Sequence, residues 1–214
     1  EFAGTRAFYD RLTQKPLTLA LKRAFDILAS LVLLILLSPV FLALAILIKR
    51  DSPGPVFYRQ VRVGRYGKPF RIFKFRTMRE GADQHGPEVT VAEDPRITKM
   101  GHKLRGGRLD EFPQLINVLK GEMSFVGPRP EVPRYVAHYT SDMWGTLLVR
   151  PGVTAPASIQ FKDENEILDL AEDPEKVYVE DVLPRKMKLN EAYVKELSLW
   201  GDIKILWQTV LAVA

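Results

Sequence analysis

The sequence predicts a small α/β domain of the mixed α+β kind. It is rich in helices, with a short β-hairpin, an N-terminal re-entrant membrane helix and amphipathic helices at the membrane interface. Three observations predict this class: a long uncharged segment near the N-terminus, two β-rich stretches joined by a turn, and helical periodicity further on. The 214 residues suffice for one compact domain and a membrane element. We expect residues 1–50 to form a tail and the membrane helix. Residues 51–214 then form a domain on the cytoplasmic side that ends in an interfacial helix.

The membrane segment is the 22-residue run Ile27–Ile48, which carries no charge. At about 1.5 Å per residue, a straight helix here could just cross a hydrocarbon core of about 30 Å. Ser38-Pro39 interrupts it, because proline kinks a helix and a serine hydroxyl can bond a freed carbonyl. Basic pairs at 22–23 and 49–50 flank both ends, and the positive-inside rule places both on the cytoplasmic side. These features favour a kinked helix that enters and leaves one leaflet, over a straight span or a buried core helix.

Asp26 lies at the inner edge of this segment, where an unpaired carboxylate is costly. Lys22, one helical turn earlier, is the expected partner in an ion pair at the membrane interface.

Charge is distributed unevenly along the chain, whose net charge is +5. Residues 1–110 carry 20 Lys and Arg against 10 Asp and Glu, and residues 111–214 carry 11 against 16. The basic excess predicts an anionic partner such as lipid head groups or phosphates. No nucleic-acid-binding module is recognisable, so nucleic acid is not the expected partner. The chain has no cysteine, which excludes a thiolate zinc site, a disulfide framework and a cysteine nucleophile.

Two β-rich stretches, VFYRQVRV and FRIFKFRTM, flank a glycine-containing turn over residues 64–69 and predict a hairpin. The hairpin places Lys74, Arg76 and Arg79 near one end. Residues 80–96 are rich in turn formers and predict a mobile loop.

Residues 109–119 show helical spacing of apolar residues, with Pro113 suited to the first turn and Gly121 to the end. Residues 127–130, Gly-Pro-Arg-Pro, predict a stiff loop. Residues 131–139 predict the start of another helix, and residues 152–163 predict a loop.

The C-terminal part predicts two helices. Residues 183–197 read as a helix with a polar face. Residues 198–214 set Trp200 and Trp207 among aliphatic residues, with Asp202 and Lys204 opposite. That pattern favours a helix lying on the membrane interface, with a core-packed helix as the alternative.

Asp110 and Glu111 are the candidate catalytic residues, at the expected N-terminus of the 109–119 helix. The helix dipole stabilises anions there. An ionised carboxylate can attack phosphorus as a nucleophile, and a neighbouring carboxylate can hold Mg²⁺ against phosphate oxygens. Taken alone, the pair is more often a helix cap, so other residues must decide.

Arg129 is the strongest candidate for binding a phosphate, because Pro128 and Pro130 fix the direction from which it approaches. A planar guanidinium suits bidentate binding of phosphate oxygens. Lys74 and Arg76 on the predicted strand, and Arg105 before the carboxylate pair, add positive charge. Such a set could hold a diphosphate.

The string LDEFPQLINVLKGEMSFVGPRP at 109–130 resembles the signature of the bacterial sugar transferases, the monotopic phosphoglycosyl transferases that begin surface-glycan assembly. FKFRTM at 73–78, RPGVT at 150–154 and the KRAFD…SP segment at 22–39 also match, in family order. The resemblance covers roughly residues 20–214. It implies that residues 51–214 are a cytoplasmic catalytic domain at the bacterial inner membrane, anchored by a re-entrant helix kinked at Ser38-Pro39.

The resemblance also implies a reaction. Asp110 would form an aspartyl-phosphosugar intermediate from a UDP-sugar and release UMP, and polyprenyl (undecaprenyl) phosphate would then accept the sugar phosphate. Glu111, with Asp110, would bind Mg²⁺, or Glu111 would assist proton transfer. Arg105 would contact the polyprenyl phosphate, and Arg129 with Pro128 and Pro130 would bind the nucleotide.

Gly106-Gly107-Arg108 departs from the bulkier residues usual in the family before Leu-Asp-Glu, which predicts a more flexible approach to Asp110. The alternative function is a membrane-tethered scaffold that binds anionic lipids without catalysis. The sequence leaves open the sugar, the glycan pathway, a homo-oligomer and any further N-terminal region.

Overall fold

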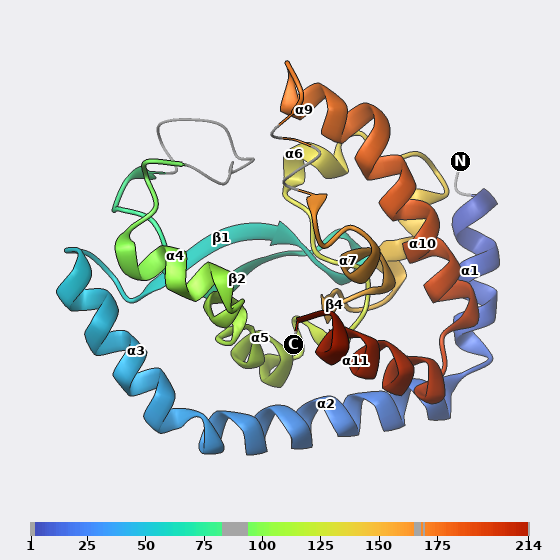
Figure 1. Cartoon of the computed structure of the whole chain (residues 1–214). Helices are drawn as coiled ribbons and strands as arrows, with labels where there is room; N and C mark the ends of the chain where they lie inside the picture. The colour runs from blue at the N-terminus through green and yellow to red at the C-terminus, as the bar shows by residue number, and fades with distance from the viewer. Residues whose placement is uncertain (1–2, 83–93, 165–167, 169, 214) are drawn as a thin grey trace.

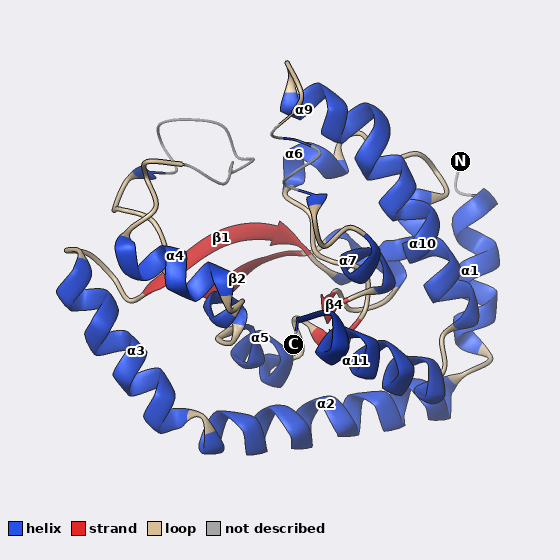
Figure 2. Ribbon diagram, in the orientation of Figure 1, coloured by secondary structure: helices blue, strands red, loops and turns tan. Residues whose placement is uncertain are grey.

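The computed structural model describes residues 3–82, 94–164, 168 and 170–213. Helices surround a few short strands in the middle of the molecule (Figure 2). The predicted class, a helix-rich mixed domain with a short antiparallel hairpin, is confirmed, and a second small sheet accompanies the hairpin. The division at residue 50 stays a prediction, as does the mobility of the 80–96 loop, in which residues 83–93 lie outside the described part.

Helices α2 (Pro16–Leu36) and α3 (Ser38–Asp51) form a bent arm around one side of the molecule (Figure 1). No single helix in the described ranges is both long and apolar enough to cross a bilayer. Together, α2 and α3 are long and apolar enough, but they are bent by 61° where they meet. Pro39 lies in the first turn of α3, where its missing N–H is tolerated, and the Ser38 hydroxyl donates to the Ile35 carbonyl at 2.8 Å. The helix thus breaks where the sequence predicted, whereas re-entry into a membrane stays a prediction.

Apolar side chains are exposed along three helices. On α2 they are Leu17, Leu21, Phe25, Ile27, Leu28, Leu31, Val32, Ile35 and Leu36, and on α3 they are Val40, Leu42, Ile46 and Leu47. Helix α11 (Leu199–Val213) exposes Ile203, Val210 and Leu211 and two tryptophans, Trp200 at 75% and Trp207 at 63%. The other side of α11 packs into the core through Ile205, so this helix covers the core and also exposes an apolar face, and its place at a membrane interface stays a prediction.

A buried polar cluster fixes the inner side of α2 to the rest of the domain. This anchor cluster consists of Lys22, Asp26, Ser124, Tyr193 and Asp202. Lys22 Nζ lies 2.5 Å from Asp202 Oδ2, and the Tyr193 hydroxyl donates to Asp202 Oδ1 at 2.8 Å. Asp26 Oδ1 accepts from the Ser124 hydroxyl and from the Phe125 N–H, both at 3.0 Å.

The predicted ion pair between Lys22 and Asp26 is therefore wrong. Lys22 pairs with Asp202, which lies 180 residues further along the chain, and Asp26 accepts from β3. Helical spacing brings Lys22 and Asp26 to one side of α2, but the domain packed against that side supplies better partners for both.

Two pairs of strands lie inside the helices. β1 (Phe57–Val63) and β2 (Pro69–Phe75) form the predicted antiparallel hairpin, with Phe57 opposite Phe75 and Val63 opposite Pro69. β3 (Ser124–Val126) and β4 (Gly152–Thr154) pair in parallel.

The other helices and turns cover these strands. The α-helices are α1 (Ala3–Thr13), α4 (Lys99–Gly106), α5 (Gln114–Lys120), α6 (Pro133–Val136), α7 (Pro156–Gln160), α9 (Pro174–Val177) and α10 (Leu183–Glu196). The 3₁₀ turns are η1 (Arg65–Gly67), η3 (Leu109–Glu111) and η4 (Met143–Leu148), and η5 (Tyr178–Val182) is a π-helical turn.

The helix predicted at 183–197 is confirmed as α10, and the one predicted from Glu131 is the short α6. The loop predicted at 152–163 is wrong, because it contains β4 and α7. β4 forms only by pairing with β3, a contact between segments well separated in sequence that local composition does not reveal.

Helix α1 precedes the arm and packs into the main core. Phe8 and Leu12 are buried against Val149 and Tyr193, among other residues. Gly145 in η4 lets Phe8 approach closely, since a Cβ at that position would lie 2.5 Å from the Phe8 ring. The segment before α2 is thereby joined to the turn that precedes β4.

Candidate active site

The carboxylate pair lies on a chain segment with three distinct parts. Leu109–Glu111 form the 3₁₀ turn η3, Pro113 is the N-cap of α5, and α5 begins at Gln114. Gly121 ends α5 in the left-handed conformation, φ 85°, as the sequence predicted. The expected continuous helix is therefore broken before Pro113, because Pro113 lacks the N–H needed to continue the preceding turn.

Neither carboxylate caps α5, since its N-cap is Pro113 and no side chain accepts from its first N–H groups. Instead both face cations. Lys74 Nζ lies 2.8 Å from Glu111 Oε1 and 3.9 Å from Asp110 Oδ2. Arg129 Nη2 lies 2.5 Å from the same Glu111 oxygen. The structure thus joins Asp110, Glu111, Lys74 and Arg129 in one cluster, which we call the site cluster.

The two carboxylates have different environments. Burial alone would raise the pKa of the Glu111 carboxyl, but Arg129 and Lys74 hold that pKa well below its usual range. Burial raises the pKa of Asp110; Lys74 opposes this rise and the neighbouring Glu111 charge adds to it. No hydrogen bond reaches Asp110 from the described residues, although its side chain is only 13% exposed. Asp110 is therefore a sparsely solvated carboxylate, whereas Glu111 is a firmly ionised one.

Arg129 reaches the cluster from the loop that follows β3. Its Nη1 donates to the Val153 carbonyl of β4 at 2.5 Å and, more weakly, to Gln114 Oε1 at 3.4 Å. Gly127 and Gly152 allow the two strands to lie this close, since a Cβ at Gly127 would lie 2.5 Å from the Arg150 carbonyl oxygen. The parallel strand pair therefore sets the position of Arg129.

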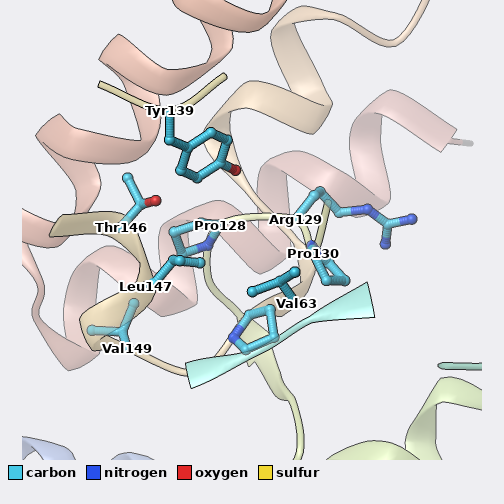
Figure 3. Close-up of a pocket in the computed structure, with 9 residues that line it drawn as sticks. Val63, Pro128, Arg129, Pro130, Tyr139, Thr146, Leu147 and Val149 are labelled. Atoms are coloured by element: carbon cyan, nitrogen blue, oxygen red, sulfur yellow. The ribbon is translucent and has the colours of Figure 1, made fainter. Parts of the chain in front are cut away.

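Pro128, Arg129 and Pro130 line a small pocket, together with Val63, Tyr139, Thr146, Leu147, Val149 and Pro151. Figure 3 shows the two proline rings at the pocket, while the guanidinium end of Arg129 extends away from the other labelled side chains. Of these three loop residues, Arg129 is the one that contacts the Glu111 carboxylate.

Arg105 lies close enough to Asp110 for their charges to interact, and its Nε donates to the Thr77 hydroxyl at 3.0 Å. Burial lowers the pKa of the Arg105 guanidinium, an effect that Asp110 opposes. Arg105 thus adds a third cation beside the site cluster.

Arg76 is not brought to the cluster. Its side chain is buried, and it donates to the Pro53 carbonyl and, at 2.7 Å, to the Ser52 carbonyl after α3. Arg76 and Lys74 lie two residues apart at the end of β2, but the Arg76 guanidinium stabilises the turn between α3 and β1.

Two amide side chains of α5, which the sequence did not predict as site residues, support the site. Asn117 is fully buried: its Oδ1 accepts from the Phe73 N–H at 2.8 Å and its Nδ2 donates to the Arg71 carbonyl at 2.9 Å. Asn117 thereby bonds α5 to β2, which carries Lys74. Gln114, also fully buried, contacts Arg129. The available signal was two amides, three residues apart, among the apolar residues that precede Lys120 in this helix.

Among the described residues, no group of three or more His, Asp or Glu side chains is arranged to hold a metal ion. Mg²⁺ commonly takes only one or two protein carboxylates and completes its shell with substrate phosphates and water. Asp110 and Glu111 can supply that number, so the residues present fit a Mg²⁺ ion that arrives with a phosphate ligand.

The fold and site together define a helix-rich protein with a bent apolar arm and a buried carboxylate pair among cations. Residues 17–214 match the model of the family described as bacterial sugar transferase, and the chain belongs to that family.

Several curated proteins are similar to this chain. A UDP-N-acetylgalactosamine-undecaprenyl-phosphate N-acetylgalactosaminephosphotransferase of Aeromonas hydrophila is 37% identical over 204 residues, 93% of this chain and 45% of that protein. A UDP-glucose:undecaprenyl-phosphate glucose-1-phosphate transferase of Escherichia coli is 39% identical, over 89% of this chain and 39% of that protein. One of the same name from Caulobacter vibrioides is 37% identical, over 88% of this chain and 68% of that protein. The chain spans less than half the length of the first two relatives.

Proposed function

We propose that this protein is a phosphoglycosyl transferase that moves a sugar 1-phosphate from a UDP-sugar to polyprenyl (undecaprenyl) phosphate, the first membrane step of surface-glycan synthesis. The observation that carries the proposal is Asp110, a buried carboxylate without hydrogen-bond donors among the described residues, beside an ionised Glu111 and the cations Lys74 and Arg129. The relatives' names support the same reaction class but differ in the sugar, N-acetylgalactosamine in one and glucose in another. The sugar donor therefore stays open.

In the first step, a carboxylate oxygen of Asp110 attacks the phosphorus that bears the sugar. The bond from that phosphorus to the bridging oxygen breaks, and the oxygen leaves on UMP with the electron pair. In the second step, a phosphate oxygen of the polyprenyl phosphate attacks the phosphorus of the aspartyl-phosphosugar, and the Asp110 carboxylate is restored. The low number of donors at Asp110 suits this role, because few hydrogen bonds must be broken before attack.

The surrounding cations neutralise the phosphate charges. Lys74 and Arg129 already converge on one Glu111 oxygen, 2.8 and 2.5 Å away, so a diphosphate placed between them would meet two positive groups. Arg105, beside Asp110, is assigned to the phosphate of the polyprenyl acceptor. The site thereby offers separate cations to donor and acceptor.

Glu111, with Asp110, is the proposed ligand of Mg²⁺, which when bound supplies further neutralisation of the diphosphate. The lowered pKa of Glu111 supports this role over proton transfer, because a carboxylate that stays ionised cannot act as a general acid. Since Arg129 and Lys74 share Oε1, a metal on Glu111 would compete with them for the carboxylate.

The bent arm is the proposed membrane anchor, with the catalytic domain on the cytoplasmic face of the bacterial inner membrane. The exposed apolar faces of α2 and α11 and the 61° break support a hairpin that enters one leaflet. Membrane lipids are then partners as well as solvent, and the lipid acceptor meets the site without leaving the bilayer.

Release of UMP from a panel of UDP-sugars, with polyprenyl phosphate and Mg²⁺, tests the proposed function. Mass spectrometry after incubation with donor alone should find a phosphosugar adduct on Asp110. Lipid binding without UMP release from any donor would instead support the scaffold alternative.

Topology is tested separately by labelling single cysteines, which the cysteine-free chain allows without background. Cysteines placed at the two ends of the α2–α3 arm should be labelled from the same side of the membrane. Pro39→Ala should favour a straighter helix and raise the fraction labelled from opposite sides. Labels on opposite sides in the parent chain would contradict the re-entrant anchor.

A further inference from the structure

Gln114 is the first residue of α5, four residues after Asp110, and its side chain has no exposed surface. Its Oε1 accepts from Arg129 Nη1 at 3.4 Å, while its Nε2 has no hydrogen-bond partner in the described part of the chain. A buried amide with an unused donor is destabilising compared with an apolar side chain of similar size. Packing alone therefore does not account for an amide at this position.

The contacts of Arg129 show what Gln114 contributes. Arg129 Nη1 donates to Val153 and Gln114, and Nη2 donates to Glu111, so the guanidinium meets three segments of the chain. The Arg129 side chain keeps 23% of its surface exposed, whereas Gln114 is entirely covered. Gln114 thus lies on the buried, inner side of Arg129, whose side chain is still partly accessible to solvent.

A neutral acceptor suits this inner position. Arg129 lies between the carboxylates and β4, and the negative charges of Asp110 and Glu111 both attract it. A neutral acceptor on Nη1 helps to hold the orientation in which Nη2 donates to Glu111. Because an amide adds no charge, the guanidinium keeps its full positive charge for an outer ligand.

We propose that Gln114 is a positioning residue that holds the Arg129 guanidinium in place for the diphosphate of the donor. The inference rests on the proposed function, in which Arg129 binds that diphosphate. Gln114 acts through Arg129 and need not touch the substrate.

The test is a double-mutant cycle in purified full-length protein, using Gln114→Met, Arg129→Ala and both together. Gln114→Met keeps similar volume and removes the acceptor, so kcat/KM for the UDP-sugar should fall by about 10–100-fold, mainly through KM. In the Arg129→Ala background the same change should have little further effect, because the group that it positions is already absent. Equal losses in the two backgrounds would overturn the proposal.

Asn190→Leu is the matched control. Asn190 is also a buried amide with one atom lacking a partner, but it lies in α10 and its side chain contacts Met187. This variant should keep the wild-type kcat/KM per folded molecule. A loss as large as that of Gln114→Met would show that removing any buried amide has this effect and would also overturn the proposal.

Gln114→Glu tests the idea without a change of shape and covers the case in which Gln114→Met fails to fold. A carboxylate here should pair with Arg129 and compete for it with the donor, so UMP affinity measured by calorimetry should fall. An unchanged affinity would count against the role of Gln114.

Wild-type protein that releases no UMP from any donor would contradict the proposed function itself. Wild-type turnover with an unaffected Gln114→Met would contradict only the inference about Gln114.

Discussion

The anchor cluster and the site cluster are both groups of buried charges next to the β3–β4 pair, yet their hydrogen bonding differs. In the anchor cluster, Asp26 accepts from Ser124 and Phe125, and Asp202 accepts from Lys22 and Tyr193. In the site cluster, Glu111 likewise accepts from Lys74 and Arg129, whereas Asp110 accepts no hydrogen bond from the described residues.

This difference separates structural from chemical uses of buried charge. A carboxylate that receives two donors is stabilised in place and has little tendency to react. A carboxylate that is desolvated and short of donors costs stability, and that cost is expected where a group must remain available to react. The predictions below test whether the two clusters divide in this way.

The largest effect is expected for Asp110→Asn. UMP release should fall by at least about 10³-fold, because an amide is a far weaker nucleophile toward phosphorus. The unfolding free energy should change by less than about 1 kcal/mol, since no hydrogen bond in the described structure is lost. Steady-state kinetics and denaturant unfolding of one preparation measure both. Near-normal turnover would remove Asp110 from the role of nucleophile.

Asp202→Asn should show the opposite pattern. The variant removes the anion that lies 2.5 Å from the buried Lys22 ammonium, which should lower the unfolding free energy by about 3–5 kcal/mol. Activity per folded molecule should stay close to that of the parent.

The double variant Lys22→Met/Asp202→Leu should recover much of the stability lost by Asp202→Asn, because the Lys22–Asp202 pair is removed as a whole, although Asp26 loses the attraction of the Lys22 charge. Thermal unfolding in lipid nanodiscs would compare the three variants. A stable Asp202→Asn protein with impaired turnover would break the distinction between the two clusters.

The sequence predicted the features that depend on nearby residues. The break at Ser38-Pro39, the hairpin and the end of α5 at Gly121 follow from local backbone chemistry, and the structure contains all three. The anchor cluster could not be predicted in this way, because Lys22 finds Asp202 only when α11 packs against α2. For the same reason β4 could not be predicted, because it forms only by pairing with β3, which is distant in the sequence.

For the candidate site, the motif predicted a cluster of Asp110, Glu111, Lys74 and Arg129, and the structure brings these side chains together. The sequence also predicted Arg76 as a phosphate-binding residue of this cluster, but its guanidinium donates to the carbonyls of the two residues after α3. Strand alternation gives the face on which a side chain lies but not the partner that a long arginine reaches.

Asn117 tests whether a fully bonded polar group within the site motif behaves like the anchor cluster. Asn117→Leu leaves the Phe73 N–H and the Arg71 carbonyl without their partner, so the unfolding free energy should fall by about 2–3 kcal/mol. Because Asn117 bonds β2 close to Lys74, KM for the donor should rise modestly while the adduct on Asp110 still forms. Loss of the adduct in a protein that remains folded would contradict this assignment.

The smallest effect is expected at Arg108, which precedes η3 and has a left-handed backbone, φ 51°. The neighbouring Gly107 has φ −95°, so the left-handed position falls on Arg108 and not on a glycine, while the flexible approach to Asp110 stays a prediction. A left-handed conformation costs a non-glycine residue about 1–2 kcal/mol, and glycine loses about 0.5–1 kcal/mol through extra freedom in the unfolded chain. Arg108→Gly should therefore stabilise the fold by at most about 1.5 kcal/mol. Arg108→Ala removes the same charge but keeps the strain, so the difference between the two variants in denaturant unfolding isolates the backbone contribution. If Arg108→Gly were less stable than Arg108→Ala by the full cost of glycine, about 0.5–1 kcal/mol, the turn before Asp110 would store no strain, and the site would differ from the anchor cluster in its hydrogen bonding alone.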